Sequence, residues 1–159
     1  MKFSSIDAAL EDIRSGKQII VVDSKDRENE GDLVMAAELT TPDSINFMAK
    51  EGRGLICVSI TADRASLLEL EPMERRNNSS LHNTNFTISV DAKDNTTTGI
   101  SAFDRAETIR VIIDKKTKSN DLARPGHIFP IVGKEGGVLR RAGHTEASID
   151  FAEMAGLKP

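Results

Sequence analysis

The sequence has few of the features that mark secreted or membrane-spanning proteins. It contains one cysteine, Cys57, which cannot form a disulfide within the chain, as is typical of a reducing compartment. No apolar run approaches the roughly 18 residues that cross a bilayer, and the first residues lack the pattern of a secretory signal. We therefore predict a cytoplasmic protein that does not act at a membrane.

Aromatic residues and excess positive charge are also missing. Trp and Tyr are absent, six Phe are scattered along the chain, and the formal net charge is −4. Stacking on bases and a basic stripe along a phosphate backbone are therefore not expected. The basic stretches at 74–76 and 115–118 are short and are most simply solvated surface. A nucleic-acid partner is disfavoured, and small molecules or further copies of the chain are the expected partners.

The 159 residues suit one domain with a sizeable core, which we take to span residues 1–159. Several neighbouring strands are joined too closely for a helical crossover. We therefore predict an α+β fold, an α/β-type layered sandwich in which helices flank a mixed β-sheet. Periodicity and capping signals predict strands over 18–23, 32–38, 54–60, 85–92 and 124–133, and helices over 5–16, 40–52, 62–70, 101–114 and 143–156.

Five local expectations accompany this fold. Strand 18–23 is continuously apolar, which indicates burial on both faces. The prolines of segment 124–133 indicate a strand near a sheet edge. Thr145 is expected to cap the last helix, and Cys57 to be a small buried hydrophobic side chain. Residues 71–84 lack apolar periodicity and are predicted to form a lid or binding loop.

The segment "DRENEGD" at 26–32 concentrates carboxylates between two apolar stretches. If it is extended, Asp26, Glu28, Glu30 and Asp32 share one face and Arg27 takes the other. Such a face suits a hard cation such as Mg²⁺, Mn²⁺ or Ca²⁺. A calcium-binding EF-hand loop is excluded, because Ala37 stands where its bidentate glutamate is required. By itself, the segment favours a solvated turn over a metal site.

A second constellation lies in "RRAGHTEAS" at 140–148. A glycine loop runs there into a helix N-terminus, whose free N–H groups and dipole favour an anion such as phosphate, helped by Arg141 and the Thr145 hydroxyl. His144 is either a capping-region imidazole or part of a mixed nitrogen and oxygen metal site. Taken together, the two segments suggest a metal-dependent enzyme that acts on a phosphorylated metabolite.

At these residues the sequence resembles 3,4-dihydroxy-2-butanone 4-phosphate synthase. The resemblance covers nearly the whole chain and rests on "DRENEGDLVMAAE", "GLICV", "TTGISAFDRAETI", "ARPGHIFPI" and "RRAGHTEASIDFAEMAGLKP". The opening "FSSIDAALEDI" also resembles the synthase half of bifunctional chains that carry a GTP cyclohydrolase II domain.

The resemblance implies a homodimeric lyase of riboflavin biosynthesis, with Mg²⁺ or Mn²⁺ as cofactor. That family converts D-ribulose 5-phosphate into 3,4-dihydroxy-2-butanone 4-phosphate and formate by enolisation, dehydration, skeletal rearrangement and formate loss. By motif position it implies metal ligands at Glu28 and His144 and catalytic roles for His127, Glu28 and Asp32. It implies substrate contacts at Arg27, Glu28, Asp32, Arg141, Ala142, Gly143, His144 and Thr145, with Thr98 and Glu30 as further polar contacts.

Two departures from the family pattern stand out. The family carries another essential glutamate on a strand shortly after "GLKP", so we expect a shortened chain or a fragment of a longer one, with impaired turnover and an uncovered sheet edge. Phe103 stands where a smaller or polar residue is expected, and we expect it to change packing rather than chemistry. The alternative function is a non-catalytic relative that binds a metal and a sugar phosphate.

Overall fold

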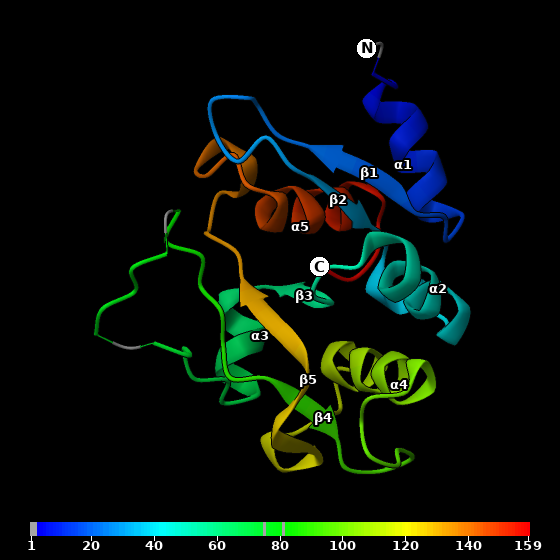
Figure 1. The fold of residues 1–159 in the computed structure, drawn as a ribbon, viewed down its shortest axis with the longest axis vertical. Coiled ribbons are helices and arrows are strands. Elements are labelled where there is room, and N and C mark those ends of the chain that lie inside the picture. Colours follow the sequence, from blue (N-terminus) through cyan, green and yellow to red (C-terminus); the bar gives the residue numbers. More distant parts are fainter. Residues whose placement is uncertain (1–2, 75, 81) are drawn as a thin grey trace.

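The computed structural model describes residues 3–74, 76–80 and 82–159; positions 75 and 81 of the predicted loop 71–84 lie outside these ranges. Figure 1 shows a hairpin with two helices in the upper part of the molecule and a second sheet with the other helices below it. The helices are α1 (Ile6–Arg14), α2 (Pro42–Phe47), α3 (Ala62–Leu67), α4 (Ala102–Ile113) and α5 (His144–Met154), and the strands are β1 (Ile19–Val22), β2 (Gly31–Val34), β3 (Cys57–Ile60), β4 (Val90–Ala92) and β5 (Leu122–Val132).

The strands form two sheets among the described residues. β1 and β2 pair antiparallel as a hairpin, with Ile19 opposite Val34 and Val22 opposite Gly31, so the acidic segment forms its tip. The second sheet has the order β3-β5-β4, in which β5 is parallel to β3 and antiparallel to β4. The predicted mixed sheet with flanking helices is confirmed.

Local signals place most helix starts correctly. The hydroxyl oxygens of Ser5, Thr41 and Ser101 each accept a backbone N–H of the first turn, and Thr41 forms a reciprocal capping box with Ser44. The cap predicted at Thr145 is wrong. α5 begins one residue earlier, with Gly143 as its N-cap and without a side-chain cap, so Thr145 lies inside the first turn.

Two strand predictions are wrong. β1 is not buried on both faces, because the hairpin packs one side on the molecule and leaves Ile20 69% and Val22 45% exposed. β5 is the central strand rather than an edge strand. Its prolines are accommodated because Pro125 falls where the partner of β4 shifts from Ile128 to Ala123, and the Pro130 carbonyl accepts the backbone N–H of Thr87.

The core consists of two apolar clusters of buried side chains. The larger one joins the three-stranded sheet to α2, α3 and α4 and contains the fully buried Ile60, Ile112 and Ile128. The smaller one joins α1, the hairpin and α5 around Leu10 and Ile13. Within the described part of the chain, no helix is long and apolar enough to cross a membrane. α5 contacts both halves of the molecule, because it packs against β1 of the hairpin and against β3 of the three-stranded sheet.

Candidate active site

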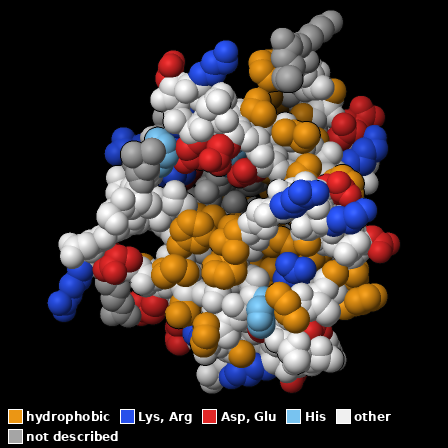
Figure 2. Space-filling model, in the orientation of Figure 1, with side chains coloured by type: hydrophobic (Ala, Val, Ile, Leu, Met, Phe, Trp, Pro, Cys, Tyr) orange, Lys and Arg blue, Asp and Glu red, His pale blue; other side chains and the backbone are white. Residues whose placement is uncertain are grey.

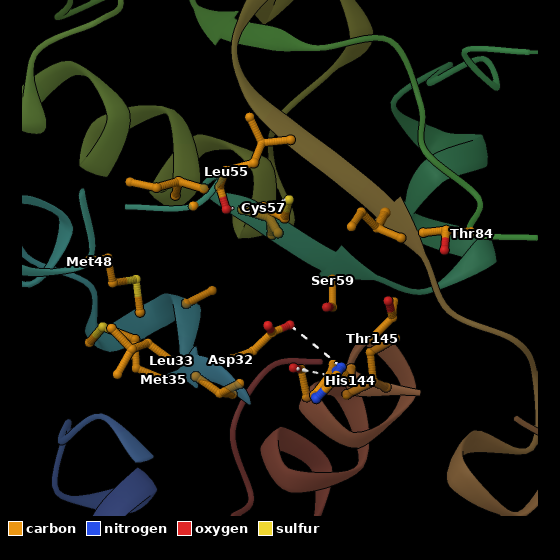
Figure 3. A pocket seen from close by; sticks show the side chains of 18 of the residues that line it. Asp32, Leu33, Met35, Met48, Leu55, Cys57, Ser59, Thr84, His144 and Thr145 are labelled. Carbon is orange, nitrogen blue, oxygen red and sulfur yellow. Dashed lines mark hydrogen bonds and ion pairs between the residues drawn. The ribbon is translucent and has the colours of Figure 1, made fainter. Parts of the chain in front are cut away.

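A cavity of about 690 Å³ lies between the hairpin, the face of β3 and β5, and the start of α5. In Figure 2, acidic side chains gather at the upper rim of a hollow whose floor is hydrophobic. The close view in Figure 3 shows Asp32, Ser59, His144 and Thr145 near one another, and Met48 and Leu55 on the apolar side. The cavity therefore has a charged end and an apolar end.

The hairpin tip is organised by one carboxylate, that of Asp23. It accepts hydrogen bonds from Arg27 Nη1 (2.8 Å) and from the backbone N–H groups of Glu28 (2.9 Å) and Glu30 (3.0 Å). Desolvation raises the pKa of Asp23, but these donors lower it more, so the net pKa lies well below its usual value. Asp23 is therefore ionised at neutral pH and fixes the backbone that carries Glu28.

The expectation that four alternate carboxylates share one extended face is wrong in part. Residues 25–28 form a turn, and Asp26 is exposed and does not line the cavity. Glu28, Glu30 and Asp32 do line it. The turn arises because the Asp23 carboxylate gathers backbone N–H groups that an extended strand would direct to a neighbour.

The His144 imidazole faces the carboxylates of the hairpin. Its Nδ1 lies 3.6 Å from Glu28 Oε2 and 3.8 Å from Asp32 Oδ2. Its Nε2 is buried and has no hydrogen-bond partner among the residues that the structure describes. Asp23, Glu28 and His144 each offer a ligand atom, and these atoms lie within 4.8 Å of one another.

These donors fit a divalent cation. Because the Asp23 oxygens already accept three N–H groups, Glu28 and His144 are the better candidates for ligands. One carboxylate and one imidazole leave positions for water and substrate oxygens, as sites for Mg²⁺ and Mn²⁺ usually do. A His144 ring with Nδ1 near two carboxylates and a buried Nε2 without a hydrogen-bond partner among the described residues also distinguishes the site from an ordinary solvated turn.

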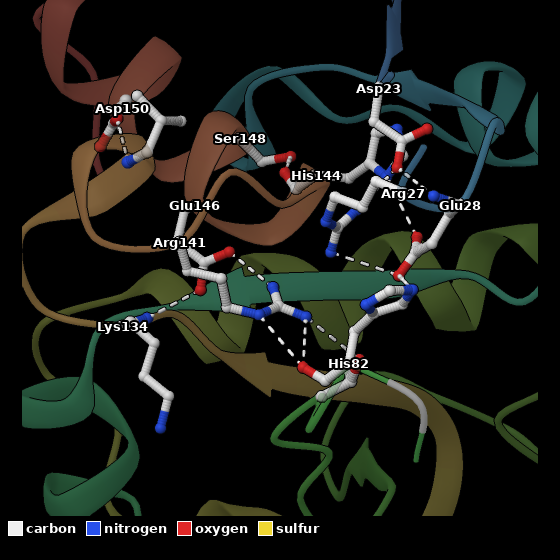
Figure 4. A network of polar contacts seen from close by, with 12 residues as sticks. Asp23, Arg27, Glu28, His82, Lys134, Arg141, His144, Glu146, Ser148 and Asp150 are labelled. Carbon is white, nitrogen blue, oxygen red and sulfur yellow. Dashed lines mark hydrogen bonds and ion pairs between the residues drawn. The ribbon is translucent and has the colours of Figure 1, made fainter. Parts of the chain in front are cut away.

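A second polar network, drawn in Figure 4, surrounds Arg141. Arg141 Nη1 donates to Glu146 Oε2, Nη2 donates to the carbonyl of His82 (3.2 Å) and Nη2 also lies 3.3 Å from Thr84 Oγ1. Glu146 is only 1% exposed, and its Oε1 accepts the backbone N–H of Lys134 at 2.9 Å. Arg141 thus ties the end of loop 71–84 to the first turn of α5.

Both arginines of the site meet at Gly143. A Cβ built on Gly143 would collide with the Arg141 guanidinium and would lie 3.0 Å from Arg27 Nη2. Two cationic groups therefore flank the N-terminus of α5, where free backbone N–H groups already favour an anion. This arrangement suits a phosphate group.

The structure brings together most, but not all, of the residues expected from the sequence. Those that line the cavity are Arg27, Glu28, Glu30, Asp32, Arg141, His144 and Thr145. The remaining four do not line it: Ala142 and Gly143 lie in the loop before α5, Thr98 is exposed before α4, and His127 lies in β5 beside Asp91.

Sequence reasoning missed Asp23, His82 and Glu146. Asp23 lies three residues before the acidic segment 26–32 and Glu146 lies within "RRAGHTEAS", so their positions in the sequence are an available signal. His82 Nε2 lies 3.9 Å from Glu28 Oε1, which only the folding of the loop reveals. Cys57 is half-buried and lines the cavity rather than lying in the core. Burial, and secondarily the charge of Asp32, raise the pKa of its thiol to about 12, so it is neutral at pH 7.

Comparison with known proteins gives a consistent picture. Residues 7–159 match the profile of the family described as 3,4-dihydroxy-2-butanone 4-phosphate synthase. The chain is 58% identical over 160 residues to the riboflavin biosynthesis protein RibBA of Aquifex aeolicus, covering 99% of this chain and 39% of that protein. It is 56% identical over 159 residues to the 3,4-dihydroxy-2-butanone 4-phosphate synthase of Helicobacter hepaticus, covering 100% and 44%. The chain spans less than half of the length of these two relatives.

A solved structure shares the fold. A crystal structure of 3,4-dihydroxy-2-butanone 4-phosphate synthase in complex with two magnesium ions matches with a TM-score of 0.95 at 39% sequence identity. The match covers 99% of this chain and 73% of that chain.

Proposed function

Because the chain belongs to the 3,4-dihydroxy-2-butanone 4-phosphate synthase family, we propose that it converts D-ribulose 5-phosphate into 3,4-dihydroxy-2-butanone 4-phosphate and formate, a step of riboflavin biosynthesis. The observation that carries this proposal is the convergence of Glu28, Asp32 and His144 at one end of a cavity, beside two arginines and a helix N-terminus. A sugar phosphate needs both of these features, one for its reacting oxygens and one for its phosphate.

Glu28 and His144 would hold Mg²⁺ or Mn²⁺, and the complex of a solved relative with two magnesium ions supports this choice. The chemistry that such an ion supplies when bound is stabilisation of the negative charge that develops on substrate oxygens. Asp23 orients the turn that presents Glu28, so the carboxylate is positioned before substrate arrives. Preorganisation of this kind avoids a reorganisation cost during the reaction.

The groups proposed to hold the phosphate lie beside the proposed metal ligands, with Arg27 Nη2 3.2 Å from Glu28 Oε1. Arg27, Arg141 and the first turn of α5 offer guanidinium and backbone N–H donors, and the Thr145 hydroxyl lines the same cavity. Binding energy from the unreacting phosphate then positions the sugar. Asp32, whose side chain is 52% exposed, faces His144 and is placed to accept and return a proton during enolisation and loss of water.

The placement of His127 supports a homodimer. The family resemblance implies a catalytic role for His127, yet this residue does not line the cavity that Glu28 and His144 share. Thr98, another residue implied by the resemblance, also lies outside that cavity. We propose that a second copy of the chain supplies His127 to the site, so that each active site is completed across the dimer.

The test is formate release from D-ribulose 5-phosphate in the presence of Mg²⁺. We expect formate in amounts equal to the consumed sugar phosphate, and none after chelation of the metal or with unphosphorylated ribulose. The assay is run on this chain and on a version that continues through the family's next strand. If neither releases formate although sugar phosphate binds, the chain is a non-catalytic binding relative and the proposed activity is refuted.

A further inference from the structure

His127 is paired with a buried carboxylate on the neighbouring strand. Its Nδ1 lies 2.7 Å from Asp91 Oδ2, and its backbone N–H donates to Asp91 Oδ1 at 2.9 Å. Asp91 is buried, whereas the His127 side chain is 40% exposed. One carboxylate therefore fixes both the backbone and the ring of His127, and the ring still reaches solvent.

A glycine closes the other side of this pair. Gly99 has φ +91°, and a Cβ there would collide with the Asp91 carboxylate and lie 2.7 Å from His127 Nδ1. The Gly99 N–H is in turn held by Asp104 Oδ2 at 3.0 Å. The backbone of Gly99 thus packs directly against the Asp91–His127 pair, at a position where a side chain would not fit. This close packing leaves the imidazole little freedom to rotate.

The hydrogen bonds of Asp91 favour one tautomer of the ring. Asp91 Oδ1 accepts the His127 backbone N–H and Oδ2 lies opposite Nδ1, so a carboxylate in this place pairs best with a ring whose Nδ1 carries the proton. Nε2 then presents its lone pair. It has no hydrogen-bond partner among the residues in the described ranges.

We propose that Asp91 is a positioning residue that holds His127 in the Nδ1–H tautomer, with Nε2 ready to take a proton from the substrate. This inference rests on the proposed function, in which His127 is a catalytic residue. Asp91 itself touches no substrate; it acts through the orientation and protonation of the ring, as the carboxylate of a hydrolase triad does.

A purely structural role for Asp91 must be separated from this one. Asp91 also stabilises the irregular part of the β4–β5 pairing, because its carboxylate accepts the backbone N–H of His127. In the same region Ser89 Oγ accepts the backbone N–H of Gly126 at 3.2 Å. Ser89→Ala removes a hydrogen bond from the same segment and leaves the imidazole untouched, so it is the matched control.

The decisive variant is Asp91→Asn. Its single amide oxygen satisfies the His127 backbone N–H, and its NH₂ group then faces Nδ1, which must become an acceptor. The proton moves to Nε2 as a result. We expect Asp91→Asn to lower kcat about 100-fold with little change in KM, Asp91→Glu to restore part of the activity, and Ser89→Ala to keep wild-type kcat.

Imidazole ¹⁵N spectroscopy reads the tautomer without any catalysis, with the His127 signals assigned by comparison with His127→Gln. We expect a protonated Nδ1 in the wild-type protein and a protonated Nε2 in Asp91→Asn. A wild-type His127 protonated at Nε2, or a spectrum that Asp91→Asn leaves unchanged, would overturn the proposal. If the tautomers are as expected but His127→Gln keeps full activity, the role of His127 in the proposed function fails, while the pairing itself stands.

Discussion

At the scale of single residues, Asp23 decides which carboxylates of the acidic turn serve the site. By collecting three N–H groups it turns Glu28 toward His144 and leaves Asp26 in solvent. Glu28 and Asp26 therefore differ in whether their carboxylates reach the site. Exchanging each of them for its neutral amide tests this difference.

Glu28→Gln is expected to weaken metal binding and to lower kcat by at least 10-fold, because an amide oxygen is a poorer ligand than a carboxylate. Asp26→Asn, exposed in the same turn, is expected to change neither. Titration with Mn²⁺, followed by electron paramagnetic resonance, measures the affinity directly. Equal effects of the two variants would contradict the assignment of Glu28 as a ligand.

Glu146 is expected to matter through Arg141. Glu146→Gln removes the charge that holds the guanidinium while keeping an oxygen for the Lys134 N–H. A charge-assisted hydrogen bond lost in this way raises KM for the phosphorylated substrate about 10-fold, with a smaller effect on kcat. Steady-state kinetics check this, and Arg140→Ala, on the exposed neighbour, serves as control. An unchanged KM would show that Arg141 does not need Glu146 for binding.

At the scale of elements, the start of α4 and the loop before it form one hydrogen-bonded unit. The Asp104 carboxylate accepts from the Thr97 hydroxyl and from the backbone N–H groups of Thr97 and Gly99, and the backbone N–H of Asp104 donates to Ser101 Oγ, the N-cap of the helix. Hydrogen bonding to the Thr97 hydroxyl is the largest effect on the pKa of Asp104; together with the backbone donors it outweighs desolvation and lowers that pKa.

The lowered pKa of Asp104 predicts a pH-dependent stability. A depressed folded-state pKa stabilises the native state fully above the unfolded value of about 3.9, and the contribution is lost as pH falls toward the folded value. The difference in unfolding free energy between wild type and Asp104→Asn should therefore be constant from about pH 7 to 5 and shrink below about pH 4. Urea unfolding followed by circular dichroism measures it. Asp94→Asn, on an exposed side chain, should show no such trend.

At the scale of the whole molecule, the two halves differ in what they contribute. The larger apolar cluster joins the sheet to α2, α3 and α4, while the hairpin and α5 bring most of the polar groups that line the cavity. Ile112 belongs to the larger cluster and does not line the cavity, so a substitution there tests stability without changing the polar groups of the site.

Ile112→Ala is expected to lower the unfolding free energy by about 2–5 kcal/mol, because it leaves a cavity in the larger cluster. Leu139→Ala, which truncates an equally apolar side chain on the surface, is expected to change it by less than about 0.5 kcal/mol. Urea denaturation of both variants measures the difference. Similar losses would mean that Ile112 is not part of a well-packed core.

Completion of the site across a dimer predicts rescue by mixing. His127→Ala and Glu28→Gln should each have strongly reduced activity alone, but heterodimers of the two would contain one intact site. Random reassociation of equal amounts should then restore about a quarter of the wild-type activity. Refolding the variants together and measuring formate checks this. A mixture as inactive as its components would place His127 and Glu28 in the same subunit's site.

The sequence by itself determined the fold class, the family and the helix caps at Thr41 and Ser101, while it left Ser4 and Ser5 as alternative caps of α1. These features depend on local chemistry and on motifs, which can be read without knowing how distant segments pack. The same local reasoning failed at β1, at β5 and at Thr145, where neighbouring elements set the outcome.

Only the tertiary structure decided how the polar groups meet. It placed His144 beside Glu28 and Asp32, tied Arg141 to Glu146 and to loop 71–84, and kept His127 with Asp91 outside the cavity. The physical reason is that hydrogen bonds and charge pairs act over a few ångströms, whereas these residues are separated along the chain by up to 116 positions between Glu28 and His144 (144 − 28). Packing of the hairpin against α5 supplies that proximity, and no local pattern encodes it.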